Sequence, residues 1–187
     1  MKAADFYSAF NPIVHAAIVD SGGVKVGKRQ SVWNIVEENE RLVLRFATNY
    51  KYPWTESDGG TFNFQAWRVP RTAQDSTVSD LGPHNSLRAL DYLDEVTYSE
   101  MHKLNASINR RSPLAMEMDR YASKMRFTLQ AQGFPVHPDN LRLNTSPDLR
   151  YFDSYDVESW GVFFSRALPA IICGAKDEPK YVFSRAP

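Results

Sequence analysis

An acidic stretch over residues 75–100 holds the side chains with the most obvious capacity for chemistry. It contains six carboxylates against one basic residue, with a histidine ahead of its densest part and another just behind. If residues 87–96 are helical, Asp91, Asp94 and Glu95 share one face, because residues three and four positions apart are neighbours on a helix. Carboxylate oxygens grouped in this way bind divalent cations. The candidate metal site, which would make the chain a metal-dependent enzyme, is His84, Asp91, Asp94, Glu95 and His102. The competing interpretation is a solvated acidic face of a helix.

The segment that follows, residues 101–133, is basic. Six Lys or Arg residues stand there against Glu117 and Asp119. Clustered cations attract nucleic acid or an acidic partner. The candidate nucleic-acid residues are Lys103, Arg110, Arg111, Arg120 and Lys124. Because the acidic and basic segments are adjacent and opposite in sign, neutralisation of one by the other across packed helices explains them as well.

Motifs of the common catalytic classes are missing from the sequence. There is no Gly-x-Ser-x-Gly nucleophile elbow, no glycine-rich phosphate loop of either common type and no His-Glu-x-x-His zinc motif. No strand carries the acid followed by Glu-x-Lys that we would require of a metal-dependent nuclease core. The lone Cys173 excludes an internal disulfide and a multi-cysteine zinc site, and its apolar neighbours predict a buried thiol. We expect no cofactor.

Residues 42–54 alternate between apolar and mixed side chains. Every even position is apolar, aromatic or β-branched: Leu42, Leu44, Phe46, Thr48, Tyr50, Tyr52 and Trp54. A period of two predicts a strand with one apolar face. Thirteen residues at roughly 3.3 Å each would span about 43 Å, far more than an ordinary strand. The strand therefore either bends or runs out of the core.

The far end of this strand is the candidate surface for a macromolecular partner. Exposed Tyr and Trp side chains are common anchors at protein interfaces. The candidate partner-binding residues are Tyr50, Tyr52, Trp54, Trp67 and Arg68. The alternative is that these aromatic side chains pack beneath helices of the second half of the chain.

The elements around this strand follow from its pairing. We predict a three-stranded antiparallel meander over about 31–37, 42–54 and 61–69. A two-residue turn at 39–40 would place Trp33 opposite Phe46, with the apolar residues of both strands on one side. A three-residue loop at 58–60, with one glycine in the left-handed conformation, would place Trp54 opposite Phe64. The same register puts Arg68 opposite Tyr50.

Helical periodicity predicts the remaining elements. Residues 3–19 form a helix that two glycines end, unless Pro12 starts a second helix. Further helical segments are predicted at 87–96, at about 97–108 behind a capping box, at 113–132 and at 155–168. Pro169 breaks or restarts the last of these, and residues 181–183 are a candidate edge strand. A helix, three strands and then three to four helices make an α+β fold with the helices packed on the sheet.

The bulk composition is that of one ordinary globular domain. The 187 residues suffice for a single core. We expect one domain over 1–187, with the first helix and the meander in 1–70, a polar loop at 70–84 and a helical half in 85–187. Twenty-two basic residues balance twenty-two acidic ones, so no global charge draws the chain to nucleic acid or to a membrane. No apolar run reaches the ~18 residues of a membrane span, and the start lacks the apolar core of a signal peptide. We expect a cytoplasmic protein.

The order of features over residues 6–69 resembles a known family. A leading helix is followed by a glycine-marked basic turn at 22–29 and an aromatic strand. A second strand, ending in an Asn-aromatic-Lys segment, and the run Gly60-Thr-Phe-Asn-Phe64 come next. This order is similar to that of the bacterial family catalogued as domain of unknown function 4304. The resemblance implies an α+β fold, and it carries no activity and no functional residue with it.

These observations together predict a cytoplasmic α+β domain of bacterial or phage origin without catalytic activity of its own. Its predicted role is recognition of a macromolecular partner, a protein rather than a nucleic acid, through the aromatic hairpin. The alternatives are a metal-dependent enzyme that uses the acidic segment 84–102 and a nucleic-acid binder that uses the basic segment 103–126.

Overall fold

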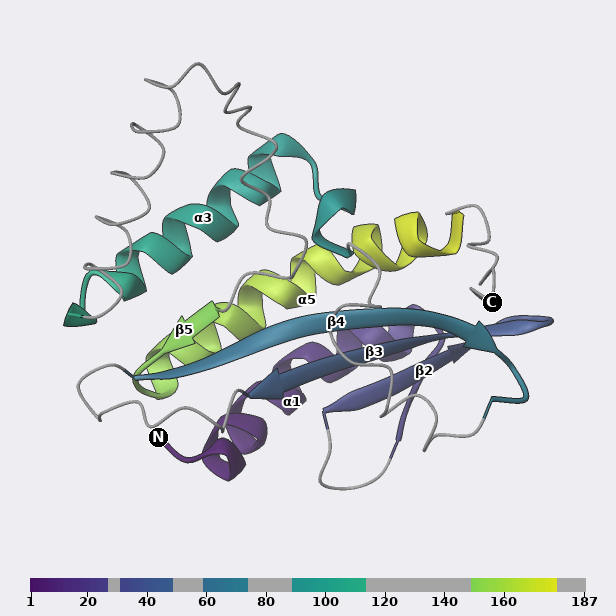
Figure 1. Cartoon of the computed structure of the whole chain (residues 1–187), viewed down its shortest axis with the longest axis horizontal. Coiled ribbons are helices and arrows are strands. Elements are labelled where there is room, and N and C mark those ends of the chain that lie inside the picture. Colours follow the sequence, from purple (N-terminus) through teal and green to yellow (C-terminus); the bar gives the residue numbers. More distant parts are fainter. Residues whose placement is uncertain (27–30, 49–58, 74–88, 114–148, 178–187) are drawn as a thin grey trace, which may run out of the picture.

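The computed structural model of the chain describes residues 1–26, 31–48, 59–73, 89–113 and 149–177. Five strands form one antiparallel sheet in the order β1-β2-β3-β4-β5, and α1 and α5 lie together on one face of it (Figure 1). In chain order the elements are α1 (Ala3–Asp20), β1 (Gly23–Lys25), β2 (Val32–Val36), β3 (Glu40–Thr48), β4 (Gly60–Pro70), the 3-10 helix η3 (Ala89–Tyr92), α3 (Glu95–Asn109), β5 (Leu149–Tyr151) and α5 (Ser154–Asp177). The predicted α+β class with an N-terminal helix is confirmed.

The sheet contains two more strands than the sequence predicted. β1 and β5 add to its two edges, and each has only three residues, too few for an alternating pattern to be recognised. β2 and β4 lie within about one residue of their predicted ranges. β3 begins two residues earlier than predicted and is described as far as Thr48. The rest of the predicted strand, residues 49–54, lies outside the described residues.

The first helix is continuous. Phe6, Phe10, Val14 and Ile18 recur every fourth residue and are fully buried, as an amphipathic helix requires. Pro12 lies within the helix and does not start a second one. The chain leaves α1 through Gly22, whose φ of 86° is in the left-handed region that glycine adopts without steric cost.

β2 and β3 pair two residues away from the predicted register. Trp33 lies opposite Leu44, not opposite Phe46. The connection is therefore residues 38–39, closed by a hydrogen bond of 2.8 Å from the Glu37 N–H to the Glu40 carbonyl. A slip of two residues keeps every side chain on its own face. The buried face was therefore predicted correctly although the partners were wrong.

β3 and β4 pair eight residues away from the predicted register. Phe46 lies opposite Phe64, in the place that the sequence predicted for Trp54. The predicted three-residue loop is therefore wrong, because the ladder between these strands already ends at the pair Thr48–Phe62. Gly59, just before β4, has a φ of 69°, so the prediction of a left-handed glycine in this connection is confirmed.

The core lies between the sheet and the pair of helices α1 and α5. It is rich in aromatic side chains, and its mutually contacting rings are Phe6, Phe10, Phe46, Phe62, Phe64, Trp160, Phe163 and Phe164. The two helices approach closely at Gly161, where an added Cβ would lie 2.9 Å from the Ile13 side chain. The small glycine thus lets α1 and α5 cover the sheet as one layer.

The helices of the second half differ from the predictions at their ends. α3 begins at Glu95 behind Asp94, ahead of the predicted capping box. α5 continues through Pro169 to Asp177. Cys173 is exposed, so the prediction of a buried thiol is wrong. The apolar run 170–173 is longer than one turn of a helix, so a single buried face cannot cover all four of its residues. The predicted helix at 113–132, apart from its first residue, and the predicted strand at 181–183 lie outside the described residues. Among those that are described, no helix has the length and apolarity needed to cross a membrane.

Candidate functional site

The corner between β5 and α5 positions the start of the last helix. Asp153 precedes the first residue of α5, and its carboxylate accepts a hydrogen bond of 3.0 Å from the Asp156 N–H, as a helix N-cap does. Asp156 is buried and accepts a hydrogen bond of 2.7 Å from the Phe152 N–H. Arg111, just beyond α3, forms ion pairs with both carboxylates, and its guanidinium lies 4.5 Å from the centre of the Phe152 ring. This cluster ties α3 to α5.

Asp153 is held in its charged form by these contacts. The Asp156 N–H, and after it the Arg111 guanidinium, hold the pKa of the Asp153 carboxyl below its ordinary value. Since the folded pKa is lower than the unfolded value of about 3.9, the carboxylate stabilises the fold above about pH 4. Its contribution is lost as the pH falls through the folded pKa.

Replacing this cap gives a pH-dependent loss of stability. We expect Asp153→Ala to lower the free energy of unfolding by roughly 1 kcal/mol at neutral pH, and the difference from wild type to shrink in acid. Urea unfolding at about pH 7 and about pH 3 measures both effects. The exposed neighbour Ser154 provides the control Ser154→Ala, with an expected change below about 0.5 kcal/mol. A difference of the same size at both pH values would contradict the assignment.

An open groove with a volume of about 540 Å³ lies between α3 and α5. Its apolar lining is Leu104 from α3 together with Tyr155, Val162 and Phe163 from α5. Its charged lining is Glu100 and Lys103 from α3 together with Glu158 and Arg166 from α5. Arg166 and Glu100 form an ion pair of 3.2 Å between the two helices. The groove thus combines apolar side chains with charges of both signs.

α5 carries apolar side chains on its groove side as well as on its buried face. One face, which includes Val157, Trp160 and Phe164, is buried against the sheet and α1. On the other face, Tyr155 is 75% exposed and Val162 is 53% exposed. Large apolar side chains that stay exposed beside a concave surface are typical of interaction sites.

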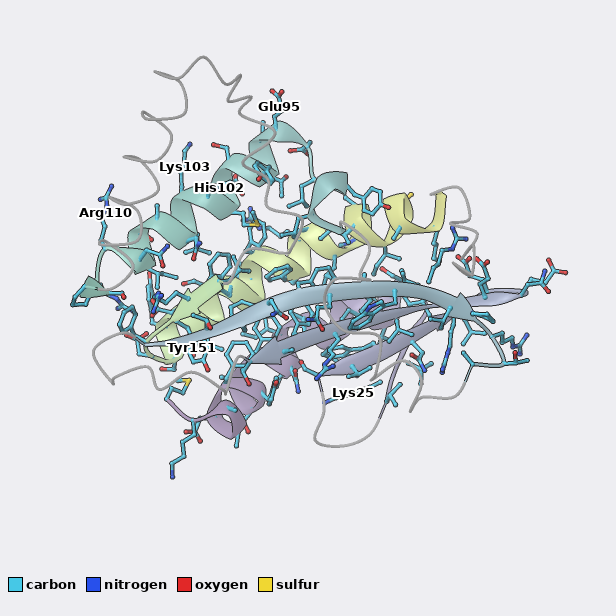
Figure 2. The ribbon with its side chains drawn as sticks, viewed as in Figure 1. Lys25, Glu95, His102, Lys103, Arg110 and Tyr151 are labelled. Carbon is cyan, nitrogen blue, oxygen red and sulfur yellow. The ribbon has the colours of Figure 1, made fainter. Side chains whose placement is uncertain are left out.

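The candidate metal ligands do not converge where the structure describes them. Asp94 caps α3, accepting a hydrogen bond of 2.7 Å from the Thr97 N–H, and this bond holds the pKa of its carboxyl below the ordinary value. Glu95 and His102 are exposed and seven residues apart on the same helix (Figure 2), a rise of about 10 Å. His84 and the side chain of Asp91 lie outside the described residues. Within the described part of the chain, no three His, Cys, Asp or Glu residues group closely enough to hold a metal ion.

The candidate nucleic-acid residues fall into three groups. Lys103 on α3 and Arg110, directly after its last residue, are exposed (Figure 2). Arg111 pairs with carboxylates of the β5–α5 corner. Arg120 and Lys124 lie outside the described residues. The sequence offered mutual neutralisation of the two segments as an alternative. In the structure, Arg111 of the basic segment pairs with Asp153 and Asp156. Glu100 of the acidic segment pairs with Arg166 of α5.

The candidate partner-binding residues are also divided. Trp67 is 3% exposed and packs with Val43 and Val69 on the second face of the sheet, so it belongs to no exposed patch. Arg68 lies opposite Leu42, and the predicted pairing with the tyrosine at position 50 is wrong. Its guanidinium pairs with Glu40 and Glu37 at 2.9 and 3.4 Å. Tyr50, Tyr52 and Trp54 lie outside the described residues.

The groove was not predicted from the sequence. Helical periodicity predicted the buried face of α5 and assigned no binding role to Tyr155, Val162 and Pro169. These residues recur every seventh position and share the opposite face of the helix. That spacing was the available signal. Tyr151, at the same corner, was also missed: burial raises the pKa of its hydroxyl to about 12.

No protein-family model, curated protein or solved structure matches this chain.

Proposed function

We propose that this chain is a protein-recognition domain that binds an amphipathic helix of a partner in the α3–α5 groove and has no catalytic role of its own. The observation that carries the proposal is the groove's combination of an apolar lining with charges of both signs. The proposal keeps the predicted class of function, protein recognition, and moves its surface from the aromatic hairpin to the two helices.

The apolar lining supports a helical ligand. The helices α3 and α5 border the groove on its two sides. An amphipathic helix binds such a groove by inserting apolar side chains at positions i, i+3 or i+4, and i+7. Tyr155 is the expected anchor for the ligand because a tyrosine supplies a large contact area at little cost in conformational entropy. The residue is 75% exposed, so most of its surface is available for contact.

The charged lining limits which helices fit. Glu100 and Glu158 favour cations on the ligand, and Lys103 and Arg166 favour anions. A ligand with charges of both signs beside its apolar stripe is therefore preferred over a uniformly anionic one such as nucleic acid. A cytoplasmic location is part of the proposal and is supported by the single cysteine, which leaves the chain without an internal disulfide.

Site-specific photo-crosslinking tests this function. A photoreactive amino acid at position 155 is expected to give discrete protein adducts in cells of the organism that encodes the chain. The same amino acid at Val24, which is 67% exposed on β1, is expected to give none. Val162→Asp should lower the adduct yield at position 155 by about tenfold or more. Val36→Asp, at a site of nearly equal exposure on β2, should leave the yield unchanged.

Two results would reject the proposal. One is the absence of any protein adduct at position 155, or adducts with nucleic acid alone. The other is a protein adduct whose yield Val162→Asp does not change, because such an adduct would not depend on the groove.

A further inference from the structure

We propose that the helix occupying the α3–α5 groove is α5 of a second copy of this chain, packed antiparallel about a two-fold axis at Val162. This inference rests on the proposed function and names its partner. In a two-fold dimer the same patch faces itself, so a surface has to be complementary to its own rotated image. The exposed face of α5 meets that condition in both its apolar and its charged residues.

The apolar part of this face is centred on Val162. Tyr155 lies seven residues before it and Pro169 seven residues after it, and all three are exposed. Seven residues are almost two turns of a helix, so the three side chains lie along one line. The exposed face of α5 therefore carries a line of apolar side chains spaced seven residues apart, with Glu158 and Arg166 between them.

The charges select the antiparallel orientation. Glu158 lies four residues before Val162 and Arg166 four residues after it, and both are exposed on the groove side. Antiparallel packing about Val162 places each residue opposite the one equally far on the other side of the centre. Glu158 of each copy then faces Arg166 of the other, which gives two ion pairs for each dimer. Parallel packing would place Glu158 against Glu158 and Arg166 against Arg166, and like charges opposite each other are repulsive.

The contacts that Arg166 makes within one chain do not oppose this arrangement. Its ion pair with Glu100 is 3.2 Å long, and the two side chains are 64% and 46% exposed. An exposed pair of this kind adds little to stability, and a guanidinium has enough N–H donors for two carboxylates. Arg166 can therefore hold Glu100 of its own chain and Glu158 of the other copy together.

Charge reversal tests the dimer and its orientation in the purified full chain. Sedimentation equilibrium should show a monomer–dimer equilibrium for the wild type. Glu158→Arg and Arg166→Glu should each weaken self-association by on the order of 100-fold, because each creates two like-charge contacts in every dimer. An equimolar mixture of the two variants should restore dimers, since one copy then carries two arginines and the other two glutamates. The double variant Glu158→Arg/Arg166→Glu should also dimerise. Unchanged thermal unfolding of the variants serves as the control for folding.

A cysteine at the axis provides an independent measurement. Residue 162 faces its own copy across the two-fold axis, so Val162→Cys in a Cys173→Ser background should form an intermolecular disulfide on mild oxidation. Val24→Cys in the same background should not. A monomeric wild type at every concentration, or variants whose mixture does not restore dimers, would overturn the inference. If the chain is monomeric while groove-dependent adducts to another protein persist at position 155, the recognition function stands and only the second copy is rejected.

Discussion

Phe164→Ala is expected to lower the free energy of unfolding by about 3–5 kcal/mol, a large part of the stability of an ordinary domain. Phe164 is fully buried at the centre of the aromatic core. Its ring centre lies 4.9 Å from that of Phe46, 5.5 Å from Phe64 and 6.2 Å from Phe10. One side chain of α5 thus contacts two strands and α1, and truncating it opens a cavity that all three must line.

Chemical denaturation followed by circular dichroism measures this loss. Val19→Ala, at a 44% exposed position on α1, is the control, with an expected change within about 0.5 kcal/mol. Phe164→Leu should fall between wild type and Phe164→Ala because it leaves a smaller void. A loss below about 1 kcal/mol for Phe164→Ala would contradict the central position of this ring.

Substitutions of Trp160 are expected to lower the free energy of unfolding through two separable effects. Its ring is fully buried, and its Nε1–H donates a hydrogen bond of 2.8 Å to the Arg150 carbonyl. Trp160→Phe keeps an aromatic ring and removes the donor, so we expect a loss of about 1–3 kcal/mol from the carbonyl left without that partner. Trp160→Ala adds the cavity and should cost about 3–5 kcal/mol.

The comparison of the two variants checks which contact matters. Both are measured by the same denaturation experiment, and Tyr155→Phe, at a 75% exposed position on the same helix, is the control for removing a polar aromatic atom. Equal stabilities for wild type and Trp160→Phe would contradict a role for the hydrogen bond that attaches β5 to α5.

The register of the sheet shows which features an alternating sequence pattern predicts and which it does not. Alternation correctly assigned Leu42, Leu44 and Phe46 to the buried face, because the period of two is a property of each strand alone. The pairing partners were wrong by two residues between β2 and β3 and by eight between β3 and β4. Both errors are even numbers. A slip by an even number of residues leaves the burial pattern unchanged, so matching apolar faces could not detect it.

In the candidate site, too, local features were predictable from the sequence and contacts between distant residues were not. Asp94 looked like a metal ligand because acids gather around it, and in the structure it is the N-cap of α3. The pairs that build the β5–α5 corner and the groove join residues far apart in sequence. Arg111 and Asp156 are 45 positions apart, and Glu100 and Arg166 are 66 apart. No spacing rule within one helix or strand connects such residues.

The local elements of this fold and the contacts between them are therefore determined in different ways. By itself the sequence determined the α+β class, the first helix, the ranges of β2 and β4 and the buried faces, because these depend on periodicity and caps within a few neighbouring residues. Only the tertiary structure decided the strand partners, the two short edge strands and which charges meet. Those features depend on contacts between segments that are far apart in the sequence. Such contacts form only when the helices pack on the sheet. The groove between α3 and α5, on which the proposed function rests, belongs to this second group.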